Sequence, residues 1–407
     1  MFKKSFIFLW IGQSFANLGD VFYIVSVISL LYSLTESAFY TAFVPFSITI
    51  ARFLGGLFLP LVVNRLKLKC LLIISQGAKT FLLLLLFLCF STVHFDTSNT
   101  VSFVFLLISG IAFLDGWAVP VRQSLVVNLV HKDQLMKTNS FLSITDQVLH
   151  FSGWPLGALV VAHFSGMKLL LITLALFAMS VFFMMFISVQ EKKRIHSSEN
   201  HGDSMLKGWR ALWTKPSLRL ATFLEILDTL ASVVWIAAIL YVYVDETLHK
   251  SEAWWGYINS SFFAGLLIGG LICLKNKRLL SLFPQRILFL SSITIAIFTI
   301  LFGFTSNEWI ALGCSVAVGV FSQFHLILIT TIFQIETDEE LIPNVFSARD
   351  AVMTGLFGVG TLFYGVLADW LPIVYAFVLS VCFLCLYSLL VVTHGHVFNK
   401  GKTFSKS

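Results

Sequence analysis

Apolar runs of about 20 residues alternate with short clusters of charged residues along most of the chain, a length typical of membrane spans. A helix rises about 1.5 Å per residue, so each run is long enough to cross the roughly 30 Å hydrocarbon core of a bilayer. The runs lack the alternating pattern of barrel strands, and backbone groups in lipid must bond within their own segment, so helices are expected. The pattern predicts twelve spans, at about 6–32, 38–63, 70–93, 100–121, 140–164, 169–189, 218–244, 253–274, 287–305, 309–333, 347–369 and 372–394.

The composition agrees with lipid as the main solvent. Of the 407 residues 57% are apolar and 12% are Asp, Glu, Lys or Arg, against about 25% charged residues in an ordinary soluble domain. The six cysteines lie in or beside apolar runs, where they are expected to act as small hydrophobic residues. We therefore predict an all-α membrane protein rather than a soluble enzyme.

The basic residues predict the orientation. An even number of spans puts both termini on one side, and the connections on the other side would carry only Lys168 and Lys250. By the positive-inside rule both termini are cytoplasmic, in a multi-pass protein of the cell membrane. The net charge of +6 follows from the same bias, so it favours anionic lipid headgroups as partners and not nucleic acid.

The longest polar stretch divides the chain into two halves. We predict a six-helix bundle over 1–190, a cytoplasmic linker over 191–217, a second six-helix bundle over 218–394 and a cytoplasmic tail over 395–407. Two such bundles are a recurrent transporter plan, with the substrate site between them near the membrane midplane. Four identities at an offset of 205 residues support an internal repeat: Asp133 with Asp338, Asn139 with Asn344, Phe141 with Phe346 and Gly153 with Gly358.

Several short motifs resemble those of one transporter superfamily. Gly19-Asp20 is similar to a Leu-Gly-Asp signature in a first span, and the loop that holds Arg65 and Lys69 is similar to an Asp-Arg-x-Gly-Arg-Lys loop, with Asn64 in place of its Asp. Residues 75–79 are similar to Ser-Asp-x-x-Arg with both charged positions changed. The motifs resemble the major facilitator superfamily, and within it the branch of macrolide-efflux and enterobactin-exporter-like proteins.

The resemblance covers nearly the whole chain. Gly153, Pro155 and Gly157 are similar to the Gly-Pro-x-x-Gly antiporter motif of span five, although Trp154 stands where a glycine is expected. The family implies alternating access, export of an amphiphilic drug-like cargo such as a macrolide, or of a siderophore, and proton entry as the driving force. It also implies that residues Arg65, Lys69, Asp115, Arg122 and Asp146 belong to a charged latch; the alternative is a solvated cluster at the helix ends.

Ionisable residues inside the spans are the candidate functional residues, because each costs at least about 2.5 kcal/mol at the bilayer centre. Asp20 and Arg52 share a depth, at about 21 and 18 Å from the inner surface. We expect Asp20 to face the cavity with Arg52 as a charge partner that exchanges with a proton or substrate. The alternative is a static pair that fixes helix packing.

Span seven carries two further acids. Glu225 and Asp228 lie on one helix face, where two neighbouring carboxylates in a low dielectric do not both ionise easily. They are a candidate proton-coupling site, or else a hydrated vestibule in which nothing titrates. His325 in span ten is a candidate for proton or ligand binding, or a hydrogen-bonded packing residue.

The sequence contains no Gly-x-x-x-x-Gly-Lys-Ser/Thr phosphate loop, no clustered metal ligands and no hydrolase motif, so we expect no cofactor, no metal and no enzymatic activity. The expected partners are a small-molecule substrate, protons and membrane lipid, with the monomer as the working unit. Uptake of a small metabolite or translocation of a lysolipid remains an alternative. A membrane receptor or assembly factor without transport is disfavoured, because such a bundle has no need of intramembrane carboxylates.

Overall fold

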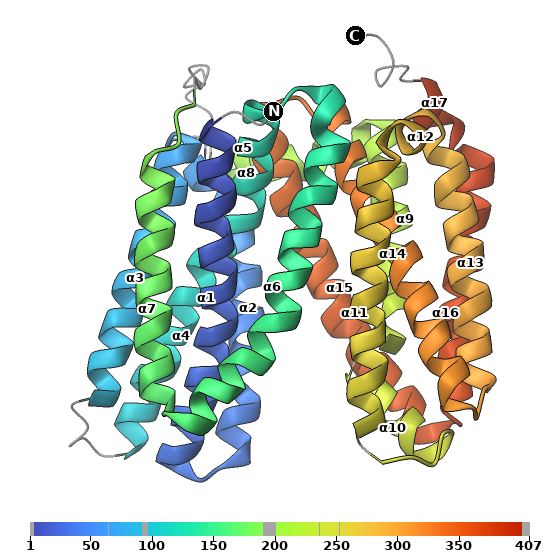
Figure 1. The fold of residues 1–407 in the computed structure, drawn as a ribbon. Helices are drawn as coiled ribbons and strands as arrows, with labels where there is room; N and C mark the ends of the chain where they lie inside the picture. The colour runs from blue at the N-terminus through green and yellow to red at the C-terminus, as the bar shows by residue number, and fades with distance from the viewer. Residues whose placement is uncertain are drawn as a thin grey trace. The chain divides into compact units, whose positions relative to one another are not determined.

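The computed structural model describes residues 4–63, 65–91, 97–189, 201–235, 237–251 and 253–400, and these ranges contain helices and no strand (Figure 1). The chain groups into two compact units, each made of three segments. Unit 1 comprises Met1–His131, Val148–Arg210 and Asp338–Ala351, and unit 2 comprises Lys132–Gln147, Ala211–Thr337 and Val352–Ser407.

Unit 1 is built mainly from six helices. Its core is aliphatic, with Leu31, Leu83 and Val104 fully buried beside Phe177. The helices are α1 (Lys4–Thr35), α2 (Ala38–Val63), α3 (Leu68–Ser91), α4 (Thr97–Asp115), α5 (Ala118–Leu129) and α7 (Gly166–Met185).

Unit 2 has a more aromatic core, in which the Tyr243 ring stacks on Phe302 at 4.4 Å and meets Phe377 edge-on. The Tyr243 hydroxyl donates to the carbonyl oxygen of Phe302, which satisfies this buried phenol. The helices are α9 (Pro216–Ser232), the short η2 (Val233–Trp235), α10 (Ala237–Glu246), α11 (Ala253–Lys275), α12 (Lys277–Leu282), α13 (Pro284–Phe304), α14 (Glu308–Glu336), α16 (Val374–His394) and α17 (His396–Lys400).

Two 29-residue helices are divided between the units. The first is α6 (Leu135–His163), which follows the single turn η1 (Lys132–Gln134), and the second is α15 (Ile342–Trp370). Residues 132–147 group with unit 2 and residues 338–351 with unit 1. Adding 205 to the first range gives 337–352, within one residue of the second at each end. The offset found in the sequence therefore relates two structurally equivalent segments.

Hydrogen bonds account for this grouping. The Asn139 amide donates to Thr331 Oγ1 at 2.9 Å and to Gln334 Oε1 at 2.7 Å, which ties the start of α6 to α14. Ser347 donates to the carbonyl oxygen of Gly56, which ties the start of α15 to α2. In each of these two segments a polar residue therefore finds its partner on a helix of the other half of the chain. The two six-helix bundles over 1–190 and 218–394 remain a prediction.

Within the described residues, ten helical segments are long and apolar enough to cross a membrane, or eleven if Pro216–Trp235 and Ile239–Glu246, bent by 44°, form one span. Helices α4 and α5 count together as one span, Thr100–Leu129. The predicted span at 140–164 coincides with α6, which is long enough but is not among these segments. Its charged and amide residues, among them Lys137, Asp146 and Gln147, lower its hydropathy, so the twelve-span count remains a prediction.

Helix α8 (His201–Thr214) lies in the predicted linker and crosses the boundary between the units at Arg210 and Ala211. The remainder of the linker before it, residues 191–200, lies outside the described residues, as do Asn64 and the end of the tail at 401–407.

Candidate functional site

Four charged side chains meet inside unit 1. Lys79 Nζ on α3 lies 2.8 Å from Asp20 Oδ1 on α1 and 2.7 Å from Asp115 Oδ1 at the end of α4. Arg52 on α2 reaches the second oxygen of Asp115 at 2.5 Å. The two cations balance the two carboxylates, as charges in a low dielectric require.

The four members of the cluster differ in their exposure. The Lys79 side chain is fully buried and Asp115 is 12% exposed, whereas Arg52 is 47% exposed. Lys79 Nζ also lies 4.9 Å from the centre of the Phe177 ring, and a cation over a ring face is attracted by the ring quadrupole. Arg52 is therefore the member of the cluster most open to its surroundings.

Glycines allow close helix contacts beside the cluster, between α1 and α7 and between α2 and the end of α4. A Cβ at Gly19 would lie 2.6 Å from Phe177 Cε1, so the residue before Asp20 must be small. A Cβ at Gly55 would overlap the carbonyl oxygen of Phe113, and one at Gly116 would overlap that of Arg52. The indole of Trp117 donates to the carbonyl oxygen of Gly55 at 2.9 Å and fixes the same crossing of α2 and α4.

The structure corrects one expectation. The ion-pair partner of Asp20 is Lys79 and not Arg52, which pairs with Asp115 instead. Asp115 belongs to this cluster, where the glycine contact brings the end of α4 against α2, and its role in a charged latch remains a prediction. Sequence reasoning missed Lys79 as a partner, although a lysine inside an apolar span was a signal that a carboxylate lay near it.

The glycine contact leads to a testable expectation. Gly55→Ala should lower the free energy of unfolding of the purified protein by about 1 to 3 kcal/mol or more, and with it the melting temperature. The new methyl group meets backbone that cannot rotate away. Gly77→Ala on α3 is the matched control, since a Cβ there meets no atom within 4 Å and alanine favours a helix. Equal melting temperatures for the two variants would contradict the close crossing.

A second ionisable pair lies in unit 2. His325 Nδ1 on α14 lies 2.8 Å from Asp228 Oδ1 on α9. An ionised carboxylate only accepts hydrogen bonds, so Nδ1 carries the hydrogen of this contact when Asp228 is ionised. His325 is 1% exposed and stacks on Tyr387 of α16, with ring centres 4.6 Å apart and planes at 6°. Asp228 is 34% exposed, so a buried imidazole holds a carboxylate whose other side is accessible.

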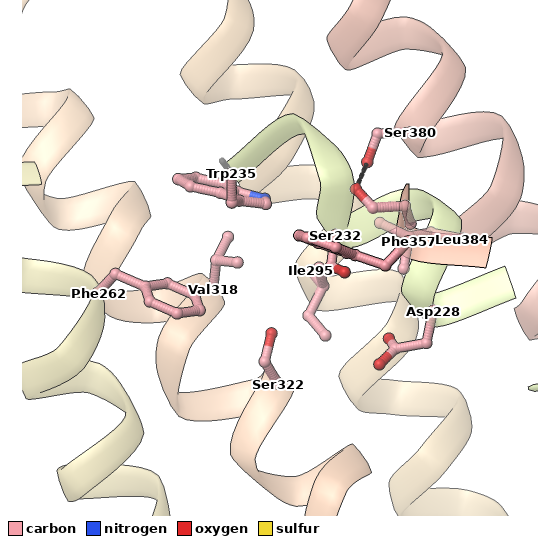
Figure 2. Close-up of a pocket in the computed structure, with 11 residues that line it drawn as sticks. Asp228, Ser232, Trp235, Phe262, Ile295, Val318, Ser322, Phe357, Ser380 and Leu384 are labelled. Atoms are coloured by element: carbon pink, nitrogen blue, oxygen red, sulfur yellow. Dashed lines mark hydrogen bonds between the residues drawn. The ribbon is translucent and has the colours of Figure 1, made fainter. Parts of the chain in front are cut away.

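Asp228 lines a cavity of about 320 Å³. Figure 2 shows its carboxylate and the hydroxyl of Ser322 facing the middle of the cavity, with the rings of Trp235 and Phe262 along another side. Trp235 and Phe262 are stacked, with centres 5.9 Å apart. The remaining lining residues are mainly apolar: Ala231, Ser232, Ile295, Val318, Phe357, Ser380 and Leu384.

The arrangement combines an apolar body with one anionic group. Aromatic walls bind varied apolar ligands without strict hydrogen-bond geometry, and a carboxylate at their edge attracts a cation or takes up a proton. Of the expected coupling residues, the structure brings Asp228 and His325 together, and it places Glu225 one turn earlier on α9, half-buried. Trp235 and Phe262 were not singled out in the sequence, where many aromatic residues occur in apolar runs.

The motif glycines of span five have a packing role in unit 1. Gly153 lies against Val21, with a Cβ position 3.0 Å from Cγ1, and Gly157 lies against Phe22. Trp154 and Pro155 are exposed. The tryptophan that departs from the family motif therefore lies off the face that contacts α1.

The remaining latch residues are spread over several elements. Lys69 Nζ donates to the carbonyl oxygen of Met185 at the end of α7, at 2.8 Å. Arg65 follows α2, Arg122 lies on α5 and Asp146 on α6, in the segment that groups with unit 2. Their role as a latch remains a prediction. Among the described residues, no group of three or more His, Cys, Asp or Glu is arranged to hold a metal ion.

Comparisons with known proteins place these features in context. A model of the family described as transmembrane secretion effector matches residues 1–401. The chain is 29% identical over 373 residues to the uncharacterized MFS-type transporter YfmI of Bacillus subtilis, with 91% of each chain covered. It is 26% identical over 371 residues to YjbB of the same organism, with 90% of this chain and 89% of the relative covered.

The structure resembles that of a bacterial homologue of the iron transporter ferroportin in its outward-facing state. The TM-score is 0.78 at 16% sequence identity, and the match covers 97% of this chain and 100% of that chain. At this identity the likeness concerns the fold and carries no information about the cargo.

Proposed function

Because this chain belongs to the transmembrane secretion effector family of MFS transporters, we propose that it is a secondary active exporter of amphiphilic, drug-like compounds, driven by proton entry. The cargo is macrolide-like, with a siderophore as the other member of the proposed range. Transport proceeds by alternating access, so that the binding cavity opens to each side of the membrane in turn.

One observation carries the proposal. The Asp228 carboxylate is 34% exposed on the wall of an aromatic cavity while the buried His325 holds its other face. A fully buried pair would leave no carboxylate surface on which a ligand or a proton could bind, whereas Asp228 keeps part of its surface open beside the cavity. Exposure towards an apolar cavity instead supports binding of a ligand or a proton.

The pair supports a simple coupling scheme. His325 donates through Nδ1, so an added proton has two acceptor positions, the Asp228 carboxylate and the imidazole Nε2. A proton bound at either position reduces the negative charge that the cavity presents to its cargo. For a cationic amphiphilic cargo, proton entry therefore favours release, and loss of the proton restores the negative charge for the next cargo molecule.

Asp20 is the second carboxylate of the proposal. A proton on Asp20 releases it from Lys79, which keeps Asp115 as a partner. Asp20→Asn should therefore abolish proton-coupled export in the folded protein, and it should also lower stability, because Lys79 and Arg52 then share the single carboxylate of Asp115. Transport in inverted vesicles and the melting temperature of the same preparation measure both properties. Wild-type coupled transport by a folded Asp20→Asn protein would remove Asp20 from the scheme.

The function is tested in cells that lack their own pumps. Cells with the wild-type chain or an empty vector are loaded with cationic dyes, macrolides or catecholate siderophores, and retention is followed with and without an uncoupler. We expect lower retention of an amphiphilic compound in cells with the wild-type chain, and loss of that difference with the uncoupler. Higher accumulation would show uptake, and equal retention of every compound would contradict export of these classes.

A further inference from the structure

Helix α8 presents two opposite faces with different chemistry. Gly208, Ala211 and Leu212 form one face and are buried. A Cβ at Gly208 would overlap the carbonyl oxygen of Asn344, so this face lies directly against the start of α15. One side of α8 is therefore occupied by protein.

The opposite face follows the same helical spacing, at i, i+3, i+4 and i+7. Leu206 is 53% exposed and Trp213 is 44% exposed, with Trp209 half-buried and Arg210 exposed between them. From Leu206 to Lys215 the sequence has three basic residues and no acidic residue. Tryptophan and leucine beside basic residues are typical of helices that lie in the headgroup region of a bilayer.

The exposed face of α8 continues onto α9, part of a candidate membrane span. The Trp213 ring meets the ring of Phe223 on α9 edge-on, with centres 5.4 Å apart, and Phe223 is 42% exposed. Together with Ile239–Glu246, α9 is long and apolar enough to form one bent span, so the exposed Phe223 ring lies on a candidate membrane span. The aromatic contact places Trp213 at the edge of the same exposed surface.

We propose that the face of α8 formed by Leu206, Trp209, Arg210 and Trp213 lies in the membrane interface and binds anionic phospholipid headgroups. The three apolar side chains enter the boundary between headgroups and acyl chains, and Arg210 pairs with a headgroup phosphate. Bound lipid holds α8 at the membrane surface, and through the Gly208 contact it steadies the start of α15.

Lipid titration of the purified full-length chain tests the charge component. Phosphatidylglycerol or phosphatidylcholine is added to protein in a neutral detergent, and the melting temperature is followed. We expect phosphatidylglycerol to stabilise the wild-type chain and to bind Arg210→Gln about fivefold more weakly, since one basic residue near the surface contributes about 1 kcal/mol. The melting temperature without lipid reports whether each variant is folded.

Arg278→Gln is the matched control, because Arg278 is an exposed arginine on α12 and not part of the α8 face. It should respond to phosphatidylglycerol as the wild-type chain does. An equal response of wild type and Arg210→Gln to phosphatidylglycerol would overturn the proposed role of Arg210. Equal stabilisation by both lipids would overturn the preference for anionic headgroups.

Insertion of the apolar residues is tested separately in vesicles of phosphatidylglycerol and phosphatidylcholine. Brominated lipids quench tryptophan emission, and the difference between wild type and Trp213→Phe isolates the contribution of Trp213. We expect stronger quenching of that contribution by bromines near the headgroup than by bromines near the chain end. Emission from Trp213 that no lipid bromine quenches would show a water-exposed face, open to a protein partner, and would overturn the proposal.

Discussion

Lys79→Met should destabilise the protein by about 3 to 5 kcal/mol, the cost of removing one member of a buried ion pair. Methionine fills the space of the lysine stem but leaves Asp20 without its cation, and Asp115 retains only Arg52. Thermal unfolding of the purified variant, with its yield from membranes, measures the loss. A melting temperature equal to that of the wild-type chain would contradict the buried network.

The double variant Lys79→Met with Asp20→Asn separates charge from packing. It removes the lysine together with the carboxylate that the lysine neutralises, and the pair of Arg52 and Asp115 remains. Part of the lost stability should return, because no uncompensated buried charge is left. A double variant no more stable than Lys79→Met would assign the loss to packing against Phe177 instead.

Asp228→Asn should reduce proton-coupled export to the level of the empty vector. Asparagine keeps the size of the side chain, but it removes the negative charge from the cavity and the carboxylate that the imidazole contacts. Export of a compound identified in the pump-deficient cells, measured in inverted vesicles with an imposed proton gradient, provides the readout. Gradient-driven export at the wild-type rate would exclude Asp228 from coupling.

Two control variants sharpen this result. Glu308→Gln removes another ion-paired carboxylate of unit 2, which lies 3.0 Å from Lys250 and outside the cavity, and should leave export unchanged. Trp235→Ala removes an aromatic wall without changing charge, and should raise the cargo concentration needed for half-maximal export while the response to the gradient persists. If export falls equally in the Glu308→Gln and Asp228→Asn proteins, the loss of export is not specific to the cavity.

The two charged sites differ in a way that matters for function. The unit 1 cluster is electrically balanced around a lysine with no exposed surface, so its first effect is to fix four helices. The unit 2 pair leaves its carboxylate on a cavity wall. The predicted phenotypes follow from that difference: loss of stability when Lys79 is changed, and loss of transport in a folded protein when Asp228 is changed.

Much of the architecture was predictable from local patterns. Apolar runs of membrane-crossing length predicted helices, and the comparisons confirm the MFS superfamily, although not the narrower macrolide-efflux and enterobactin-exporter branch. Gly265 and Gly269 lie four residues apart on α11, and a Cβ at either position would overlap backbone of α14. These features depend on residues near one another in the chain, so a single sequence carries them.

Which charged residues pair with one another could not be predicted from the sequence in the same way. The depths of Asp20 and Arg52 matched, as expected for residues counted along straight helices, yet depth does not determine which faces of two helices meet. The bound partner is Lys79, on a third helix. Likewise Asp228 and His325 were both candidates, but their 97-residue separation gave no sign that they touch.

The sequence alone determined the solvent of this protein, its helical construction and its short list of intramembrane ionisable residues, because hydropathy and the cost of charge in lipid act on each segment separately. Only the tertiary structure decided which residues pair, that the beginnings of α6 and α15 group with the opposite halves, and that Asp228 opens onto an aromatic cavity. These outcomes depend on how helices rotate and pack against one another, which is set by contacts between residues far apart in the chain.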